Sequence, residues 1–265
     1  MTKTLLLRII QAILLMILTL LLVNVWLGRA SETWWREPVT MVIYPINADY
    51  HPLTQSYIDQ LGPEHFADIE RFFAREAKRY HLDLAEPVRV NLAPQIHAAP
   101  PQVPDQPSIL DAIWWSMRMR LWVWRHETHD AHVDARIFIN YYLPGSTLTP
   151  PRHSLGLQRG MIGLVNGYAG SDFQRQNNMV AVHEFLHTLG ASDKYDSNTH
   201  QPVWPDGFAD PTQAPLYPQT RAEIMAGRVQ VSPGWALLPP DLEQVTVGAA
   251  TAIEINWLAV PPEER

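Results

Sequence analysis

The chain has 265 residues, of which 46% are hydrophobic and 18% are charged, and its net charge is −7. This composition supports a packed core in one large domain or two small ones, and the lack of a basic stripe with interleaved aromatic residues argues against a nucleic-acid partner. The absence of cysteine excludes disulfides, thiolate nucleophiles and cysteine-rich zinc sites. Histidine, aspartate and glutamate are therefore the side chains available to hold a metal ion.

The N-terminus carries a long apolar run, residues 9–28, which is broken only by Gln11, Thr19 and Asn24. Twenty helical residues span roughly 30 Å, the thickness of a bilayer core. We therefore predict a signal-anchor over residues 1–30 that crosses the cell membrane once. Because large domains after a first apolar segment are commonly exported, we expect the remaining chain on the outer, periplasmic side.

A cleaved leader is the alternative to this anchor. Lys3 and Arg8 form a charged start before the apolar run, and residues 28–30 have the small-x-small pattern of a cleavage site. In that case the mature protein would be secreted. The length of the apolar run favours the uncut anchor, since signal-peptide cores are shorter.

Residues 31–265 have the pattern of a mixed α/β domain. Short β-branched and apolar runs predict strands, and apolar residues at three- and four-residue intervals predict helices. The expected strands are residues 39–46, 88–92, 135–142 and 160–165. The expected helices are residues 53–82 with a break at Gly62-Pro63, residues 172–189, and a last helix at 241–258. Residues 93–108 are rich in proline and predict a loop.

Two further segments have local signals. Residues 113–124 are rich in tryptophan, methionine and arginine, and the partial alternation of apolar and polar residues over 118–124 predicts a half-buried strand. Its tryptophans are interpreted as core residues, with a membrane-interface belt as the alternative. Asn166-Gly167 predicts a turn after the strand at 160–165.

The strongest chemical signal is an HExxH pattern formed by His183, Glu184 and His187 within an apolar stretch. Residues four apart on a helix lie on one face, with Cβ atoms about 5–6 Å apart, so the two imidazoles can converge on one zinc ion. Glu184 directly follows the first ligand, where it can reach a water at the metal. The pattern predicts a zinc-dependent hydrolase of peptide bonds in which Glu184 is the general base.

A third ligand must come from outside the HExxH helix. Gly190 can end that helix in a left-handed conformation and turn the chain back. Asp193 follows three residues later, where its carboxylate can return to the metal. The predicted zinc ligands are therefore His183, His187 and Asp193, and the alternatives to Asp193 are Asp196, His200 and Glu223.

The full pattern from His183 to Asp193, HExxHxxGxxD, resembles the HExxHxxGxxH motif of the metzincin zinc peptidases, with aspartate in the last place. Metzincins also have a methionine in a tight turn beneath the metal, and by this resemblance Met225, followed by Ala226 and Gly227, is the Met-turn residue. The resemblance covers about residues 180–227.

The resemblance implies a zincin fold in which a mixed sheet and an active-site helix flank a cleft. The upper part of the domain would be about residues 38–190 and the lower part about residues 191–265. The implied substrate is a protein or peptide, and residues 160–170 would lie beside the cleft and could pair with extended substrate backbone. Tyr195 and Tyr217 are candidates for a second donor to the oxyanion.

Three other interpretations stay open at this stage. The chain could be a membrane-tethered zinc-binding protein that keeps a zincin fold and catalyses nothing, or an envelope protein in which the two histidines are structural. The cluster of His126, His129 and His132 could hold a second metal, although a polar surface loop is the simpler interpretation. The sequence indicates neither a cleavage specificity nor an oligomeric state.

Overall fold

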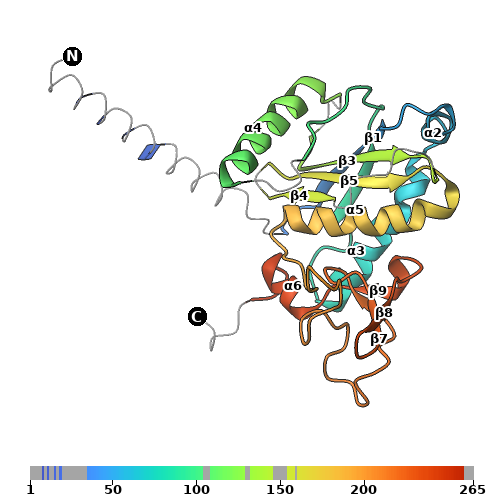
Figure 1. Cartoon of the computed structure of the whole chain (residues 1–265). Helices are drawn as coiled ribbons and strands as arrows, with labels where there is room; N and C mark the ends of the chain where they lie inside the picture. The colour runs from blue at the N-terminus through green and yellow to red at the C-terminus, as the bar shows by residue number, and fades with distance from the viewer. Residues whose placement is uncertain are drawn as a thin grey trace. The chain divides into compact units, whose positions relative to one another are not determined.

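The sheet that carries the site is built from five strands in the order β2-β1-β3-β5-β4 (Figure 1). The computed structural model describes residues 35–103, 108–128, 132–145, 154–158 and 160–259, and isolated positions between residues 8 and 19. Strands β1 (Val39–Asn47), β2 (Val88–Leu92), β3 (Ala135–Tyr142) and β5 (Ile162–Tyr168) are parallel. Strand β4 (Leu155–Leu157) is antiparallel to β5 at the edge. The sequence thus correctly predicted a mixed α/β fold.

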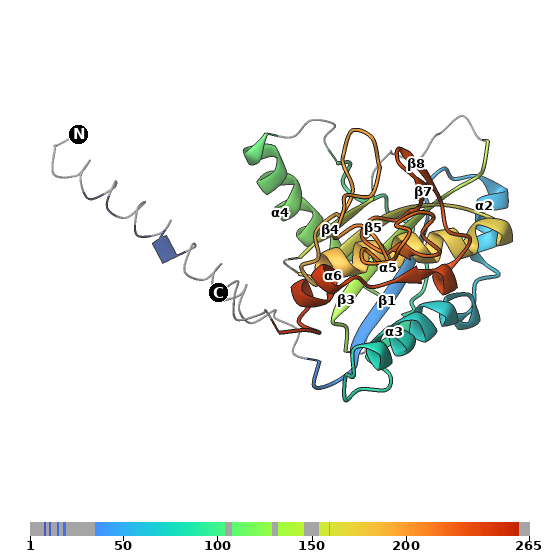
Figure 2. The same cartoon turned by 90° about the horizontal axis from the view of Figure 1, so that it is seen from below.

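Helices cover both faces of this sheet because its central strands are apolar on both sides. One face, with Met41, Ile43 and Ile137, packs against α3 (Ala67–Arg79) and α5 (Gln174–Thr188). The other face, with Tyr44 and Phe138, packs against α4 (Ile109–His126). Helix α5 lies against β5, β4 and β3 (Figure 1 and Figure 2).

The remaining elements are short. Helix α2 (Pro52–Ile58) and the 3₁₀ turn η1 (Pro63–Phe66) precede α3, as the predicted break at Gly62-Pro63 requires, and η2 (Ser171–Phe173) precedes α5. After α5 come β6 (Ala222–Glu223), β7 (Val229–Ser232), β8 (Trp235–Leu237), η3 (Leu242–Gln244), β9 (Val245–Thr246) and α6 (Ala249–Glu254). Residues Trp34–Arg265 form one unit. Its division into upper and lower parts around a cleft stays a prediction.

In the part of the chain that the structure describes, no helix is both long enough and apolar enough to span a bilayer. The predicted anchor, residues 9–28, lies almost wholly outside the described residues. It stays a prediction.

The strand predicted within residues 113–124 is wrong, because this segment belongs to helix α4. The Ser108 hydroxyl accepts a hydrogen bond from the Asp111 backbone, and the Asp111 carboxylate accepts one from the Ser108 backbone. This reciprocal cap starts a helix. The buried side chains then follow at helical spacing, namely Trp115, Met119, Trp122 and Val123. Arginines at alternate positions imitated a strand pattern.

Two other predictions need correction. Asn166-Gly167 is not a turn, because both residues continue β5 beside β3; a Cβ on Gly167 would approach the Asn177 side chain to 2.7 Å, so the glycine permits close packing. Residues 241–258 are not one helix. The β-branched Val245 and Thr246 pair with β6, and only α6 is α-helical there.

Two buried carboxylates join the C-terminal elements to the rest of the domain. Glu76 of α3 accepts hydrogen bonds from the Thr246 hydroxyl at 2.8 Å and the Val247 backbone at 3.0 Å, and it pairs with Arg75 and Arg79. Glu223 of β6 accepts from the Met225, Ala226 and Gly248 backbones and from the Thr251 hydroxyl. Each carboxylate therefore accepts hydrogen bonds from buried backbone N–H groups that would otherwise have no acceptor.

We predict that Glu76→Ala lowers the free energy of unfolding by about 2–4 kcal/mol, because it leaves the buried Thr246 hydroxyl and Val247 N–H without their acceptor. Urea unfolding of the full chain in detergent solution, followed by tryptophan fluorescence, measures this change. Glu86→Ala is the control, since Glu86 is exposed, and should change stability by less than about 0.5 kcal/mol. Equal unfolding midpoints for the two variants would contradict the role given to Glu76.

Candidate metal centre

Helix α5 is a rigid support for the side chains of the HExxH pattern. Ala181, Val182, Phe185 and Leu186 are fully buried in the main core. At the N-terminal end, the Asn178 amide donates to the His65 carbonyl at 2.7 Å and to Asp68 at 2.6 Å. The helix is thus held along its length by both apolar and polar contacts.

The structure brings the two imidazoles of His183 and His187 together on one side of α5. Their Nε2 atoms are 3.1 Å apart and their ring centroids 4.7 Å apart. The other nitrogen of each ring has a backbone partner: His183 Nδ1 lies 3.0 Å from the Ile224 carbonyl oxygen, and His187 Nδ1 lies 2.7 Å from the Ala191 carbonyl oxygen. Since a carbonyl only accepts, both Nδ1 atoms carry the hydrogen and donate it. In the neutral rings, both Nε2 atoms then present lone pairs to each other.

Asp193 completes a triangle of ligand atoms. Its Oδ1 atom is 3.1 Å from His183 Nε2 and 3.2 Å from His187 Nε2. A tetrahedral zinc ion with bonds of about 2.0–2.1 Å would separate its ligand atoms by about 3.3–3.4 Å. Three lone-pair atoms at this spacing repel one another unless a cation lies between them. The residues therefore fit a zinc ion, and their arrangement is hard to explain without a positive charge.

The charges at the site respond to this crowding. Burial lowers the pKa of His183, but the hydrogen bond to Asp193 and the nearby Glu184 outweigh burial and raise that pKa to about 8. Burial raises the pKa of Asp193, but hydrogen bonds from both imidazoles outweigh it and hold the pKa well below its ordinary value. Without a metal ion, a proton on the imidazole supplies the positive charge that the triangle needs.

The turn after α5 brings Asp193 into place, as the sequence predicted for Gly190. Gly190 has a φ of 108°, which favours glycine, and the Ala191 backbone donates to the Leu186 carbonyl at 3.0 Å. This turn also directs the Ala191 carbonyl at the His187 ring. One glycine therefore helps to fix both the orientation of the His187 ring and the direction of the chain toward Asp193.

The neighbours of Asp193 are fixed by Glu254, at the end of α6. The Glu254 carboxylate accepts hydrogen bonds from the Ser192 backbone at 3.0 Å and from the Ser192 hydroxyl at 2.7 Å. It also pairs with the largely buried Lys194 at 2.7 Å. Asp193 is thus held from both sides. Sequence reasoning missed this support because Lys194 and Glu254 are 60 residues apart.

Glu184 is buried beside the triangle. One ligand atom each from His183, Glu184 and His187 lies within 4.8 Å of the others. Among the described residues, Glu184 Oε2 has no hydrogen-bond partner, although it is buried. Burial raises the pKa of Glu184 above its ordinary value, and the two histidines only partly oppose this. A buried carboxylate oxygen with no partner is costly and points to a role in proton transfer.

The edge strand β4 passes directly over the HExxH residues. A Cβ on Gly156 would lie 2.5 Å from His187 Cβ and 2.7 Å from the Glu184 carbonyl oxygen. Only glycine can occupy this position without a shift of the strand or the helix. Gly156 is a site residue that the sequence did not reveal, since its importance depends on a contact between distant segments.

The segment around Met225 lies beneath His183. The Ile224 carbonyl accepts from His183, and Met225 itself is fully buried in the core. Glu223 closes this turn from within, and both of its carboxylate oxygens are occupied by hydrogen-bond donors. The resemblance to a Met-turn predicted that this segment belongs to the site. It did not predict the hydrogen bond from His183 to the Ile224 carbonyl.

The other candidate ligands lie in different surroundings. Asp196 accepts hydrogen bonds from Asn198 and Thr199 and closes its own turn. The His200 ring packs 5.8 Å from that of Tyr195. Within the described chain, Asp193 is therefore the aspartate within hydrogen-bonding distance of both imidazoles.

The two tyrosines proposed as oxyanion donors differ in position. Tyr195 lies with its ring 6.4 Å from that of His183, and burial together with Asp193 raises its pKa to about 12. It therefore stays protonated and can donate. Tyr217 packs against Phe208, with ring centroids 5.9 Å apart.

The second histidine cluster does not form a comparable group in the described residues. His126 contacts the Trp122 carbonyl at 2.8 Å, and His132 pairs with Asp134 at 2.9 Å. His129 lies outside the described residues. These contacts fit the interpretation as a polar surface segment.

Comparisons with known proteins do not assign the chain to a family. No protein-family model and no curated protein matches it. Among solved structures, archaemetzincin from Methanopyrus kandleri is 12% identical with a TM-score of 0.32, over 62% of this chain and 79% of that one. A chaperone–substrate complex is 13% identical with a TM-score of 0.37, over 83% of this chain and 34% of that one. Likenesses this weak carry no argument, so function must be inferred from the site itself.

Proposed function

We propose that this protein is a zinc-dependent peptidase, with His183, His187 and Asp193 as metal ligands and Glu184 as general base. The observation that carries this proposal is the triangle of ligand atoms 3.1–3.2 Å apart, with a buried and unpaired carboxylate beside it. A structural metal site would need the triangle, but it would not need the Glu184 carboxylate.

Zinc bound by these residues would act as a Lewis acid that lowers the pKa of a water molecule and polarises the scissile carbonyl. Glu184 Oε2 would accept the proton of the attacking water and then deliver it to the leaving amine. The raised pKa of Glu184 suits this exchange, because it makes the carboxylate a better acceptor of the proton. Tyr195, whose ring lies 6.4 Å from that of His183, would donate to the oxyanion.

Strand β4 is the best-placed element to hold an extended peptide. Residues 160–170 were expected to do so, but Ile162–Leu164 of β5 are paired on both sides, and only Val165–Tyr168 pair with β3 alone. Strand β4 ends the sheet in the described chain and passes over His187 and Glu184. A substrate strand added to it would lie next to the metal ligands.

The proposed setting is the outer face of the cell membrane. Residues 9–28 would anchor the chain, the described body would lie in the periplasm, and the substrate would be a protein or peptide there. The metzincin resemblance of residues 180–227 supports the reaction class and the third ligand. Secretion after cleavage of the leader is the alternative.

We predict about one zinc ion per chain in the purified protein, measured by elemental analysis after dialysis. His187→Ala and Asp193→Asn should each weaken zinc binding by more than the roughly 10–100-fold typical of an outer-shell change. Asp196→Asn is the matched control and should bind zinc as the wild type does. If Asp193→Asn retained full affinity and Asp196→Asn lost it, the ligand set would be wrong.

We predict that Glu184→Gln retains zinc but lowers the rate of peptide hydrolysis by about 10²–10⁴-fold. The amide keeps the shape of the side chain but cannot accept the proton. A peptide-library digest with mass-spectrometric detection, run on both forms at equal zinc content, measures the change. Unchanged turnover would remove Glu184 from the mechanism. Zinc binding without any turnover by the wild type would favour a non-catalytic zinc protein.

We predict that Glu254→Gln weakens zinc binding by about 10-fold without unfolding the chain, because it loosens Ser192 and Lys194 on either side of Asp193. Titration with a competing zinc chelator measures the affinity, and circular dichroism checks the fold. Glu243→Gln, at an exposed position on η3, is the control and should have no effect. Equal affinities for the two variants would show that Asp193 does not depend on this support.

A further inference from the structure

Helix α4 has a second apolar face that no described residue covers. Its inner side packs on the sheet, where Trp115, Met119, Trp122 and Val123 are buried. Its outward side carries seven large apolar residues that are each at least 46% exposed. These residues are Ile109, Leu110, Ile113, Trp114, Met117, Leu121 and Trp124.

The seven residues form one continuous stripe. At about 100° per residue, they fall within a sector of about 140° that is centred opposite the buried side of the helix. A stripe of this length, with two tryptophans, is larger than the isolated apolar side chains that ordinary surfaces expose. Since the opposite side of α4 packs on one face of the sheet, the exposed stripe faces away from that sheet; Figure 1 shows α4 over this face.

Arginines lie at both edges of the stripe. Arg118 and Arg125 lie just outside one edge, and Arg120 lies within the sector, close to the other edge. The single acidic residue of α4, Asp111, is at its first turn and bonds to the Ser108 cap. The chain as a whole carries seven more acidic than basic residues, so this cationic helix stands out against its background. Its charge complements anionic headgroups.

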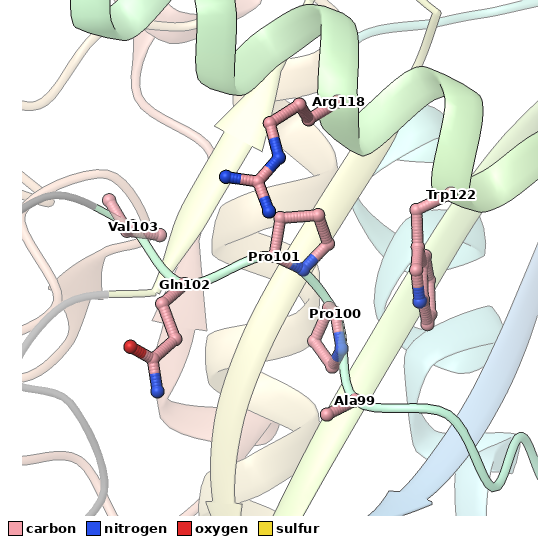
Figure 3. Close-up of a pocket in the computed structure, with 7 residues that line it drawn as sticks. All are labelled: Ala99, Pro100, Pro101, Gln102, Val103, Arg118 and Trp122. Atoms are coloured by element: carbon pink, nitrogen blue, oxygen red, sulfur yellow. The ribbon is translucent and has the colours of Figure 1, made fainter.

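The space beside α4 is open to such headgroups. Figure 3 shows a groove between α4 and the loop of residues 99–103, with a volume of about 710 Å³. Arg118 and Trp122 line it from the helix, and Pro101 and Gln102 line it from the loop. The Trp115 indole donates to the Pro101 carbonyl at 3.0 Å and holds the loop in place.

We propose that α4 lies in the plane of a lipid bilayer, with its stripe in the interface and Arg118 and Arg125 on the anionic headgroups. Exposed tryptophans prefer this depth, and arginine stems can lie along the apolar surface while their charges reach the headgroups. Helix α4 would not cross the bilayer, since no described helix is both long enough and apolar enough to do so. The predicted anchor at residues 9–28 would keep the body at a membrane surface, where a second, weak contact becomes effective.

The absence of cysteine allows a direct test on the full chain. A single cysteine is introduced by Met117→Cys within the stripe, or by Glu86→Cys at an exposed control position. Each protein is labelled with an environment-sensitive fluorophore and reconstituted into vesicles of phosphatidylcholine with phosphatidylglycerol. Spin-labelled lipids then report contact with the bilayer by quenching the fluorophore.

We expect the label at position 117 to be quenched and shifted to shorter wavelength, and the label at position 86 to be unaffected. Replacing Arg118 and Arg125 by glutamine should lower the ratio of docked to undocked helix by about 5-fold per arginine in anionic vesicles. The same pair of changes should have a smaller effect in pure phosphatidylcholine. Trp114→Ser with Trp124→Ser should reduce the quenching in both kinds of vesicle.

Three results would overturn the proposal. Equal quenching at positions 117 and 86 would place the stripe away from lipid. A shifted but unquenched label at 117, with energy transfer between labelled copies, would assign the stripe to a second copy of the chain. A shifted and unquenched label without such transfer would assign it to another segment of the same chain. None of these readouts depends on zinc or on hydrolysis.

Discussion

The central constraint on this structure is the fixed orientation of the His183 and His187 imidazoles. Each ring is held by a hydrogen bond from its Nδ1 to a backbone carbonyl. The Ile224 and Ala191 carbonyls determine the tautomer and direct both lone pairs at the Asp193 carboxylate. Such an arrangement is unfavourable without a cation, because three electron-rich atoms face one another in a partly buried space. Zinc is a cation that two nitrogens and one oxygen at this spacing would suit.

The remaining architecture supports this constraint through buried carboxylates. Glu223 closes the turn that presents the Ile224 carbonyl, and Glu254 fixes the residues on either side of Asp193. Glu76 joins α3 to the C-terminal segment that leads into α6. Glu184 differs from these three, because one of its oxygens is buried without a partner among the described residues. That contrast separates the carboxylates that hold the fold from the one available for chemistry.

The sequence predicted the elements whose signals are local. Three strands and the helix with the HExxH pattern were correct because apolar periodicity determines them, and Gly190 was correct because a positive φ favours glycine. The helix α4 was missed because both of its faces are apolar, which hides the helical period. Gly156 and the two carbonyls could not be predicted, since their roles arise from contacts between segments far apart in the chain. For the same reason Asn166 and Gly167 looked like a turn until β3 was placed beside them.

The zinc K-edge absorption spectrum of the metal-loaded full chain tests the ligand set most directly, because it reports the atoms bound to the ion. We expect two imidazole nitrogens at about 2.0–2.1 Å and a carboxylate oxygen at about 2.0–2.2 Å, with loss of one imidazole contribution in His183→Ala. A spectrum without imidazole scattering, or one that His183→Ala leaves unchanged, would contradict a zinc ion held by His183, His187 and Asp193.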